Sequence, residues 1–362
     1  MHRLRRILRL GICSFLALLV VLTFLPLWKT DEWWVRLWEF PRLQIAVLLA
    51  AGIVALVTAG PRKGQTFWIA TAAGLAALGW QLWRVAPYQP LWPTMMPSAG
   101  QCAAGDEVRL FNANVLLHND NYGGLIAIVR EIDPDVVLLI EPGPQWAAAI
   151  SPLHSAYPHR IGEPIANKYG IILLSKLPLV AAEIRHLVKP DVPSVKAGLR
   201  LRSGQTVDFY GPHPEPPLPR NDSGMRDAEL VRVGSEIRNS KRASIVLGDL
   251  NDVGWSATSR LFRSLAGVAD PRVGRGPYPT YPADIPFLAW PLDYGFATPH
   301  FRLTEMKRLP DIGSDHRAML FGLCLVGKPA ERLVPRQAPL EVREDAGEQL
   351  REGREQVAAE NE

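Results

Sequence analysis

The chain contains little cysteine and lacks several common binding motifs. Three Cys among 362 residues are too few for a scaffold held together by disulfides. Apolar residues make up 48% of the chain, which excludes a wholly disordered protein. There is no collagen repeat, no GxGxxG fingerprint, no P-loop lysine motif and no Cys pair of the kind that binds metals. Dinucleotide binding and Walker-type nucleotide binding are therefore unsupported.

Charge is distributed unevenly along the chain. Residues 1–100 contain ten basic and three acidic residues, whereas residues 327–362 contain six basic and nine acidic residues. Because the formal net charge of the whole chain is +4, residues 101–326 are neutral overall. The basic excess does not indicate nucleic-acid binding, which requires basic residues clustered on the binding domain itself.

Three stretches near the N-terminus have no charged side chain. They cover residues 10–28, 43–61 and 64–83, each of 19 or 20 residues. A helix needs about 20 mostly apolar residues to cross the hydrocarbon core of a bilayer. We therefore predict a membrane anchor over residues 1–86 with three transmembrane helices. The alternatives are buried helices of a soluble protein or, for the first stretch alone, a signal peptide.

The residues that flank these stretches suggest how the anchor is oriented. Eight of the eleven Trp precede residue 93, mostly where the stretches end, as in an interfacial aromatic belt. Residues 29–42 mix both charge signs with aromatic side chains, and we expect them to lie along the lipid headgroups. If the predicted helices cross a membrane, six basic residues lie on the same side of it as the N-terminus and four lie on the opposite side. This bias predicts an integral membrane protein, of a bacterial inner membrane, whose following domain is periplasmic or otherwise extracytoplasmic.

Composition changes twice more along the chain. Residues 87–105 are rich in Pro, Gly, Ala and small polar residues and are predicted to form a linker. Residues 328–362 are rich in Glu, Arg, Ala and Gln, and are predicted to form a disordered charged tail or a solvated helix. Residues 106–327 remain as a domain with its own core.

This domain alternates candidate strands with helical patterns, which is typical of a mixed α/β fold. Apolar residues recur at helical spacing around Leu125 to Val129 and around Leu230 to Ile237. The candidate strands cover residues 108–115, 136–140, 170–174, 207–210, 245–247, 292–296 and 319–326.

Polar residues follow several of these strands. They form the motifs Asn112-Ala113-Asn114, Glu141, Gly248-Asp249-Leu250-Asn251, Asp293-Tyr294 and Ser314-Asp315-His316. Side chains at neighbouring strand ends converge on one rim of a sheet, where α/β proteins usually bind ligands. Taken singly, each motif is also explained by turn formation.

The order of these motifs is more specific than any one of them. N-x-N-V, an apolar run followed by Glu, G-x-x-x-L-S-K, G-D-x-N, D-Y and S-D-H occur in succession over residues 108–326. This set resembles the endonuclease/exonuclease/phosphatase superfamily, which includes deoxyribonuclease I, exonuclease III, neutral sphingomyelinases and inositol polyphosphate phosphatases. The resemblance implies a four-layered αββα sandwich of the deoxyribonuclease I-like fold, and a hydrolase acting on phosphoric ester bonds.

The resemblance also implies a metal site. A phosphodiester repels hydroxide, so its hydrolysis requires neutralisation of the phosphate and activation of water. Mg²⁺ prefers oxygen ligands and often uses only one or two carboxylates. By resemblance, Glu141 and Asn114 hold Mg²⁺, or Mn²⁺, and Asp315 borders that site. A surface Glu and an Asn turn are the structural alternatives.

Catalytic roles follow by the same resemblance. Asp249 would orient and deprotonate the attacking water, and Asn251 would help to place it. His316 would contact the scissile phosphate while Asp293 holds its other ring nitrogen, which keeps the imidazole charged and correctly oriented. His213 would protonate the leaving group or bind phosphate, as in the deoxyribonuclease I and sphingomyelinase branches. The Pro-rich residues that follow His213 depart from the usual pattern, so a rigid loop stays open as an alternative.

Two Cys flank the predicted domain. Cys102 precedes its first strand and Cys324 lies in its last, so outside the cytoplasm they could form a disulfide. Cys13 lies in the first apolar stretch, where we expect it only to pack.

The sequence thus predicts a membrane-anchored, metal-dependent phosphoesterase. Its expected partners are the lipid bilayer and a phosphate ester, whether nucleic acid, phospholipid or inositol phosphate, and no protein partner is indicated. The neutral domain argues against tight binding to long duplexes. A phospholipid or sphingomyelin-type phosphodiesterase and a non-catalytic, membrane-tethered binding module are the alternatives. A transporter is disfavoured because the apolar stretches contain no ionisable residue.

Overall fold

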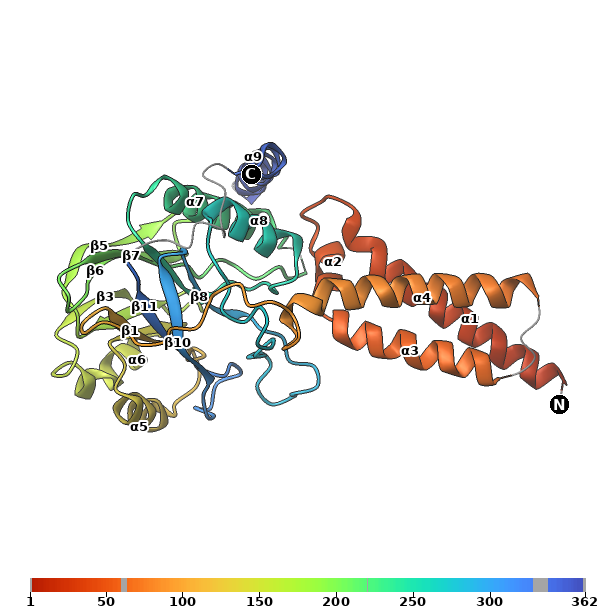
Figure 1. The fold of residues 1–362 in the computed structure, drawn as a ribbon, viewed down its shortest axis with the longest axis horizontal. Helices are drawn as coiled ribbons and strands as arrows, with labels where there is room; N and C mark the ends of the chain where they lie inside the picture. The colour runs from red at the N-terminus through yellow and green to blue at the C-terminus, as the bar shows by residue number, and fades with distance from the viewer. Residues whose placement is uncertain (1, 60–63, 220, 328–337, 361–362) are drawn as a thin grey trace.

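The computed structural model describes residues 2–59, 64–219, 221–327 and 338–360. Two parts are evident in Figure 1: a helical bundle, and a sandwich of β-sheets flanked by helices. The bundle extends from one end of the sandwich, and the start of α1 lies at the end of the bundle farthest from it.

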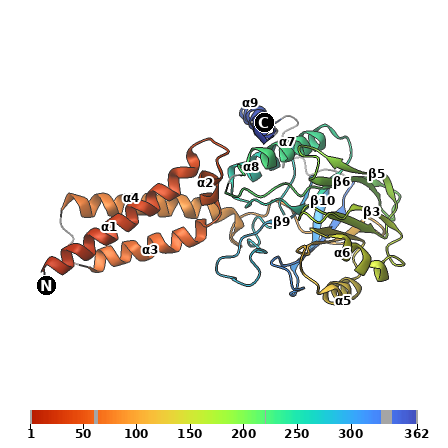
Figure 2. The same cartoon turned by 180° about the vertical axis from the view of Figure 1, so that it is seen from behind.

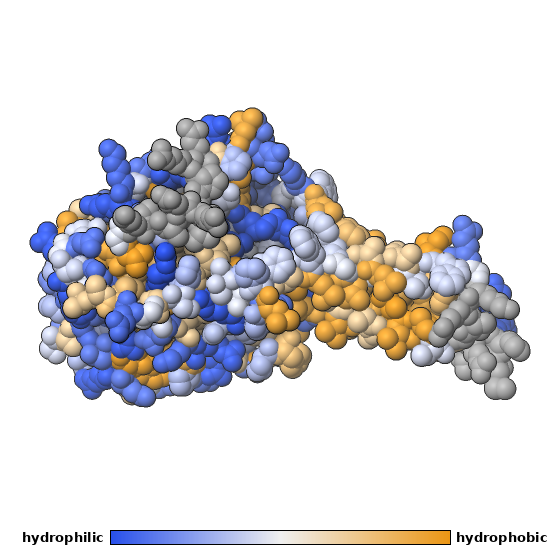
Figure 3. Space-filling view, viewed as in Figure 1, coloured by the Kyte–Doolittle hydropathy of each residue, from blue (hydrophilic) through white to orange (hydrophobic). Residues whose placement is uncertain are grey.

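The bundle consists of three long helices, α1 (His2–Phe24), α3 (Arg42–Thr58) and α4 (Gln65–Val85). Leu16, Leu49 and Ala77 are buried among them. The absence of a side chain at Gly52 permits close packing, since a Cβ there would lie 2.8 Å from Leu16 Cδ2. The outer surface of the bundle is apolar, in contrast to that of the sandwich (Figure 3). Its exposed side chains include Leu10, Leu18, Val21, Val47, Val54, Trp68, Ile69, Leu75, Leu82 and Trp83.

The prediction of three transmembrane helices requires correction. Within the described residues, one helix is long and apolar enough to span a membrane by itself, over Arg6–Leu27. A second candidate exists only if Trp33–Glu39 and Arg42–Thr58, which are bent by 72° relative to each other, count as one span. The α3 helix has only 17 residues. The α4 helix is not among the candidates.

A short connector, residues 29–41, joins α1 to α3. It contains α2 (Trp33–Arg36) and the 3-10 helix η2 (Leu37–Glu39), and it follows the 3-10 helix η1 (Leu25–Leu27). We expected its charged residues to face lipid headgroups, but Arg36 and Glu39 are buried against the sandwich. The expectation was wrong because their partners come from residues about two hundred positions later in the chain.

The sandwich consists of two packed sheets. The six-stranded sheet has the order β10-β11-β1-β2-β4-β3, and the five-stranded sheet has the order β5-β6-β7-β8-β9. Leu138, Phe209 and Phe321 belong to the core between them. The strands are β1 (Glu107–Asn114), β2 (Val136–Ile140), β3 (His159–Glu163), β4 (Ile171–Ser175), β5 (Leu179–His186), β6 (Pro193–Arg200), β7 (Thr206–Gly211), β8 (Ser244–Asp249), β9 (Asp293–Ala297), β10 (Phe301–Arg308) and β11 (Met319–Leu325).

Helices cover the outer faces of both sheets. Those of the first sheet are α5 (Tyr122–Ile132), α6 (Pro144–Ala149) and the 3-10 helix η4 (Ser151–Leu153), and those of the second are α7 (Gly224–Asn239) and α8 (Ala257–Ala266). Ser256 caps α8 by accepting a hydrogen bond from Ser259 N, and Gly267 ends it with a φ of 68°. The layers therefore follow the order helix, sheet, sheet, helix (Figure 2), and the expected mixed α/β sandwich is confirmed.

The seven predicted strands correspond to β1, β2, β4, β7, β8, β9 and β11. The sequence missed β3, β5, β6 and β10. Three of these missed strands, β3, β5 and β10, are only partly buried and mix polar with apolar residues, so they have no continuous apolar run.

Both ends of the domain differ from the expected linker and tail. After the 3-10 helix η3 (Ala86–Tyr88), Met96 is fully buried in the core between the sheets. Cys102 and Cys324 form a disulfide. Within the tail, α9 (Leu340–Glu360) packs on α7, where a Cβ on Gly353 would lie 2.5 Å from the Cβ of Ala228. Of the two alternatives expected for residues 328–362, residues 340–360 form a helix, which packs on α7 instead of standing free in solvent. Residues 328–337 and 361–362 of the predicted tail lie outside the described residues.

Candidate active site

Sheet topology brings the polar motifs to one end of the sandwich. Asn114 ends β1, and Glu141 directly follows β2, which is parallel to β1. Asp249 ends β8 and pairs in register with Asp293, the first residue of β9. His316 lies in the loop before β11, the antiparallel neighbour of β1. Residues separated by as many as two hundred positions thus meet at a single edge.

The imidazole of His316 lies between two carboxylates. Its Nδ1 is 2.9 Å from Asp293 Oδ2, and its Nε2 is 3.6 Å from Asp249 Oδ2. Asn112 Nδ2 donates to the other oxygen of Asp293 at 3.0 Å. This arrangement fixes the ring and leaves Nε2 on the side of Asp249.

Electrostatics keeps this histidine charged. Burial alone would lower the pKa of His316, but Asp249 and Asp293 more than offset that effect and raise its pKa well above the usual range. Burial also raises the pKa of Asp249, although the positive charge of His316 opposes the change. At neutral pH the site therefore presents an imidazolium beside a carboxylate.

Asp249 is positioned by the loop that follows it. Asn251 N donates to Asp249 Oδ1 at 2.9 Å. Asn251 has a φ of 50°, in the left-handed region that non-glycine residues rarely adopt. Its Nδ2 donates to Pro214 O at 2.9 Å, and its main-chain oxygen accepts from Arg226 at 3.0 Å. The tight turn thus orients one oxygen of Asp249 and leaves the other facing His316.

Glu141 presents an unsatisfied buried oxygen. Its Oε1 accepts from Asn114 Nδ2 at 2.9 Å, whereas Oε2 is buried without a hydrogen-bond partner. Burial raises the pKa of Glu141, ahead of the opposing effect of the Asn114 hydrogen bond. A buried carboxylate oxygen without a donor suits a hard cation such as Mg²⁺. The residues present therefore fit the predicted metal.

Asn114 points its side-chain nitrogen, Nδ2, toward Glu141 and Asp249. Its Nδ2 also lies 3.3 Å from Asp249 Oδ2, while its Oδ1 accepts from Leu116 N at 3.1 Å. The expected role of the Asn114 oxygen as a metal ligand stays a prediction. Asp315 lines the same cavity, and its charge contributes to the raised pKa of Glu141.

A second grouping could in principle bind a metal. One ligand atom each from Asp249, Asp293 and His316 lie within 4.8 Å of one another. However, a charged imidazole has a proton on both nitrogens and no lone pair for a metal. The oxygen site at Glu141 is the better candidate, and the Asp-Asp-His group is better suited to proton transfer.

His213 is close to these residues but is electrostatically different. It is buried, its Nδ1 has no hydrogen-bond partner, and its ring centroid lies 6.0 Å from that of Tyr169. Burial lowers its pKa, ahead of the opposing effect of Asp249. At neutral pH His213 is therefore uncharged and can donate one N–H, which suits phosphate binding better than a role as a pre-charged acid.

Glu141, His213, Asn251, Asp315 and His316 line one cavity of about 360 Å³. Asp249 and Asp293 are buried behind His316, which they contact. Sequence reasoning missed several residues that line the cavity. Lys168, Tyr169, Tyr281 and Trp290 come from loops, and the ring of Tyr281 lies 4.7 Å from that of His316. The Lys168-Tyr169 pair directly precedes the G-x-x-x-L-S-K motif, which was the one available signal. The cavity is lined by Leu37, Phe40, Glu141, Lys168, Tyr169, His213, Pro216, Pro217, Leu218, Asn251, Tyr281, Trp290, Leu292, Asp315 and His316.

Solved structures with the same fold are known. Humanized D. rerio TDP2 shares 21% sequence identity at a TM-score of 0.53, covering 60% of this chain and 99% of that chain. D. rerio TDP2 complexed with a single strand DNA product shares 20% at a TM-score of 0.52, covering 60% and 98%. The human Nocturnin catalytic domain with bound sulfate shares 16% at a TM-score of 0.50, covering 61% and 95%. At these identities the likeness concerns the fold. No curated protein is similar enough in sequence to count as a relative.

The family model for the Endonuclease/Exonuclease/phosphatase family matches residues 111–316, which is more than half of the chain. The match begins after the helical bundle and so does not test the predicted anchor. It includes every predicted catalytic and metal-site residue, and the presence of that full set argues against a non-catalytic binding module. The chain therefore belongs to the Endonuclease/Exonuclease/phosphatase family and is a hydrolase of phosphoric ester bonds.

Proposed function

We propose that the protein hydrolyses phosphodiesters with the help of Mg²⁺, and that its helical bundle anchors it in a membrane. The observation that carries the catalytic part is that Glu141 and His316 line one cavity while Asp249 and Asp293 contact the ring of His316 from behind. Mg²⁺ held at Glu141, next to Asn114 and Asp315, would neutralise phosphate charge. Mn²⁺ has the same ligand preference and could replace it.

The side chains supply the remaining chemistry. Asp249, when ionised, accepts a proton from water as its oxygen attacks phosphorus. His316 donates from Nε2 to a phosphate oxygen, because its Nδ1 is held by Asp293. The neutral His213 donates a further hydrogen bond to the phosphate. As the new P–O bond forms, the bond to the leaving oxygen breaks, and that oxygen takes up a proton.

The anchoring part rests on the surface of the bundle. The 23 residues of α1 extend about 34 Å, comparable with the thickness of a hydrocarbon core. Exposed apolar side chains cover much of the face of the bundle that Figure 3 shows, and soluble surfaces rarely have apolar patches of this extent. Arg3, Arg6 and Arg9 belong to the first turns of α1, at the end of the bundle far from the sandwich, and by the positive-inside rule they support a sandwich outside the cytoplasm. The Cys102–Cys324 disulfide suits that compartment.

Replacement of the two central groups tests the catalytic proposal. The full chain in detergent micelles is expected to hydrolyse bis(p-nitrophenyl) phosphate with Mg²⁺ or Mn²⁺ and to stop when a chelator is added. Asp249→Asn and His316→Gln should each reduce turnover by about 10²-fold or more. Asp311→Asn, which alters an exposed carboxylate just outside the site, should leave it unchanged.

Metal binding offers a separate measurement. Glu141→Gln should weaken the Mg²⁺ affinity measured by calorimetry, with the thermal unfolding temperature of the metal-free protein little changed. Full turnover by both Asp249→Asn and His316→Gln, in protein that is correctly folded, would contradict the mechanism.

A further inference from the structure

The catalytic cavity is not formed by the sandwich alone. Leu37 of the connector and Phe40 at its end line the cavity together with Glu141 and His316. Phe40 packs edge-on against Trp290, with the two ring centroids 5.6 Å apart. One wall of the active site therefore comes from the segment that joins the helices of the bundle.

The two sandwich loops that border the cavity also form hydrogen bonds with the connector and with α3. Residues 214–223 are held through Trp33 N, which donates to Asp222 Oδ1 at 2.9 Å, and through Ser223 N, which donates to Asp31 O at 2.8 Å. Residues 281–290 are held through Gln44 Nε2 of α3, which donates to Phe287 O at 3.0 Å. Figures 1 and 2 both show the segment between α8 and β9 reaching toward the bundle.

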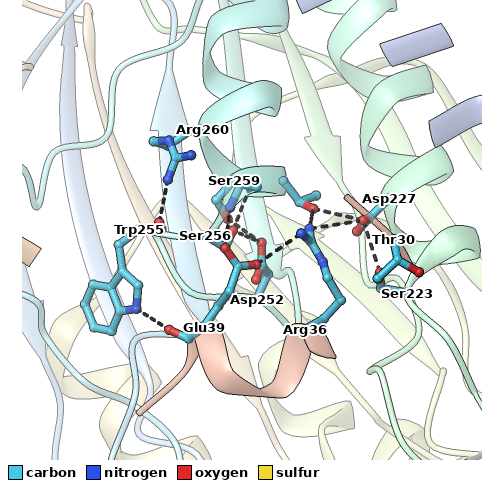
Figure 4. A network of polar contacts seen from close by, with 12 residues as sticks. Thr30, Arg36, Glu39, Ser223, Asp227, Asp252, Trp255, Ser256, Ser259 and Arg260 are labelled. Atoms are coloured by element: carbon cyan, nitrogen blue, oxygen red, sulfur yellow. Dashed lines mark hydrogen bonds and ion pairs between the residues drawn. The ribbon is translucent and has the colours of Figure 1, made fainter. Parts of the chain in front are cut away.

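A buried charge network fixes this arrangement. Arg36 lies 3.4 Å from Glu39 and 3.5 Å from Asp227, and donates to Thr258 Oγ1 at 2.5 Å (Figure 4). Trp255 Nε1 donates to Glu39 O at 2.7 Å. Because these charges are withdrawn from water, breaking their contacts would be costly. The connector is thus a fixed part of the active-site wall and not a loose tether.

The mouth of the cavity is apolar and exposed. Leu37 and Leu218, which line the cavity, are 42% and 52% exposed. Phe287, which is 78% exposed, does not line it but belongs to the same loop as the lining residues Tyr281 and Trp290. Phe287 lies beside the first turn of α3, where the exposed apolar surface of the bundle begins. The apolar surface that we assign to the membrane therefore continues to the cavity entrance.

The lining of the cavity does not suit a polyanion. Of the described residues that line it, Lys168 is the only Lys or Arg. Affinity for a nucleic-acid strand grows with the number of phosphates that basic residues neutralise. A single phosphoester with an apolar remainder fits Lys168, the charged His316, the other polar site residues and an apolar mouth better than a strand does.

We propose that the substrate is the phosphoester group of a lipid in the bilayer that holds the bundle. This inference rests on the function proposed above. The headgroup phosphate enters the cavity past Leu37 and Leu218 while the acyl chains stay in the bilayer beside Phe287. Water adds its oxygen to phosphorus and one P–O ester bond breaks. A diester lipid then yields an alcohol and a phosphomonoester, and the monoester phosphatidic acid would yield an alcohol and inorganic phosphate.

Reconstituted protein tests the proposal. The full chain is placed in vesicles of phosphatidylcholine, phosphatidylethanolamine, phosphatidylglycerol, cardiolipin and phosphatidic acid with Mg²⁺, and mass spectrometry follows the release of alcohol and phosphate ester. Bis(p-nitrophenyl) phosphate and a single-stranded oligonucleotide are assayed in parallel. We expect lipid turnover that Asp249→Asn abolishes. Leu218→Glu should lower the ratio of lipid to soluble-diester turnover by about tenfold or more, whereas Leu340→Glu, at a leucine 61% exposed on α9, should not change that ratio.

A measurement independent of catalysis tests whether the loop beside the cavity mouth contacts the bilayer. In a Cys13→Ala background, Phe287→Cys carrying a nitroxide label should collide more with lipid-soluble oxygen than with a water-soluble nickel complex. The same label at Leu340→Cys should show the reverse preference.

The outcomes distinguish failure of the lipid proposal from failure of the proposed phosphodiesterase function. No turnover of any diester would overturn the proposed function itself. Turnover of the soluble diester or the oligonucleotide without any lipid turnover would leave that function standing and overturn the lipid proposal. A water-exposed label at position 287 would overturn it as well.

Discussion

At the scale of single residues, the site depends on the paired charges around His316. Asp293 is held by Asn112 and in turn holds His316, so a charged imidazole is built into the fold before substrate arrives. The sequence pointed to this pair because D-Y and S-D-H each follow or begin a strand. The sequence did not indicate that Asn112 orients Asp293, because Asn112 was recognised only as the first residue of the N-x-N motif.

Removal of the Asp293 charge should alter the pH dependence of turnover. In the native site the pKa of His316 is raised, so its proton is retained until the pH is well above neutral. Asp293→Asn removes part of that effect, so the proton should be lost at lower pH. We expect kcat to fall by about 10²-fold and its alkaline limb to shift toward neutral pH.

The matched control is Asp208→Asn, which alters a buried carboxylate on β7 that pairs with Arg242. Its pH profile should follow that of the native protein. An alkaline limb that stays in place in Asp293→Asn would show that Asp293 does not maintain the charge of His316.

Several lining residues were beyond sequence reasoning for a physical reason. Tyr281 and Trp290 lie in a long loop with no strand or helix pattern, so nothing in the sequence indicates which of its side chains turn inward. Leu37 belongs to a segment more than one hundred residues before Glu141. Which residues share a cavity depends on tertiary packing, and no local pattern encodes it.

At the scale of elements, the connector shows how a charged segment can be misread. Arg36 and Glu39 sit among Trp residues beside an apolar stretch, a composition typical of a membrane-interface loop. They are buried because Asp227 on α7 and Thr258 on α8 complete their contacts. The charged composition of α9 likewise gave no indication of packing. Small residues in it, such as Gly353, nevertheless allow it to pack on α7.

The buried network should make Arg36 far more important for stability than an exposed cation of the same connector. Arg36→Leu removes a buried cation from both Glu39 and Asp227, which keep only Arg42 and Arg226 as cationic partners. Breaking a buried pair typically costs about 3–5 kcal/mol. Lys29→Leu removes only an exposed contact with Asp345, worth about 1 kcal/mol or less. Thermal unfolding of both variants in micelles gives the comparison.

If the two variants unfold at the same temperature, the connector is not bonded to the sandwich as described. Loss of turnover in Arg36→Leu under conditions where it remains folded would additionally link the connector to the geometry of the cavity.

At the scale of the whole molecule, the order of the motifs resembled the endonuclease/exonuclease/phosphatase superfamily, and that resemblance implied the sandwich that the structure shows. The number of membrane-spanning helices was less predictable. The absence of charge located all three long helices, but charge alone measures neither helix length nor mean hydropathy. Three of the four missed strands, β3, β5 and β10, are only partly buried and mix polar with apolar residues, so no continuous apolar run marks them.

The disulfide connects the beginning and end of the sandwich, since Cys102 and Cys324 are 222 positions apart. We expect a single alkylated Cys, Cys13, in unfolded but unreduced protein, and three after reduction. The double variant Cys102→Ser/Cys324→Ser should lower the free energy of unfolding by about 2–4 kcal/mol. Cys13→Ala is the control that keeps the bridge, and labelling of all three Cys without reductant would contradict its presence.

The fixed connector has a consequence for how the enzyme meets its substrate. A catalytic domain on a flexible linker would sample a large volume of solution. A sandwich that is fixed to the bundle through Arg36 stays at one height above the bilayer. Encounters then depend on diffusion within a plane and on the number of target molecules per unit of membrane area. Bulk concentration becomes secondary, and dilution of the vesicles should leave the initial rate per enzyme unchanged.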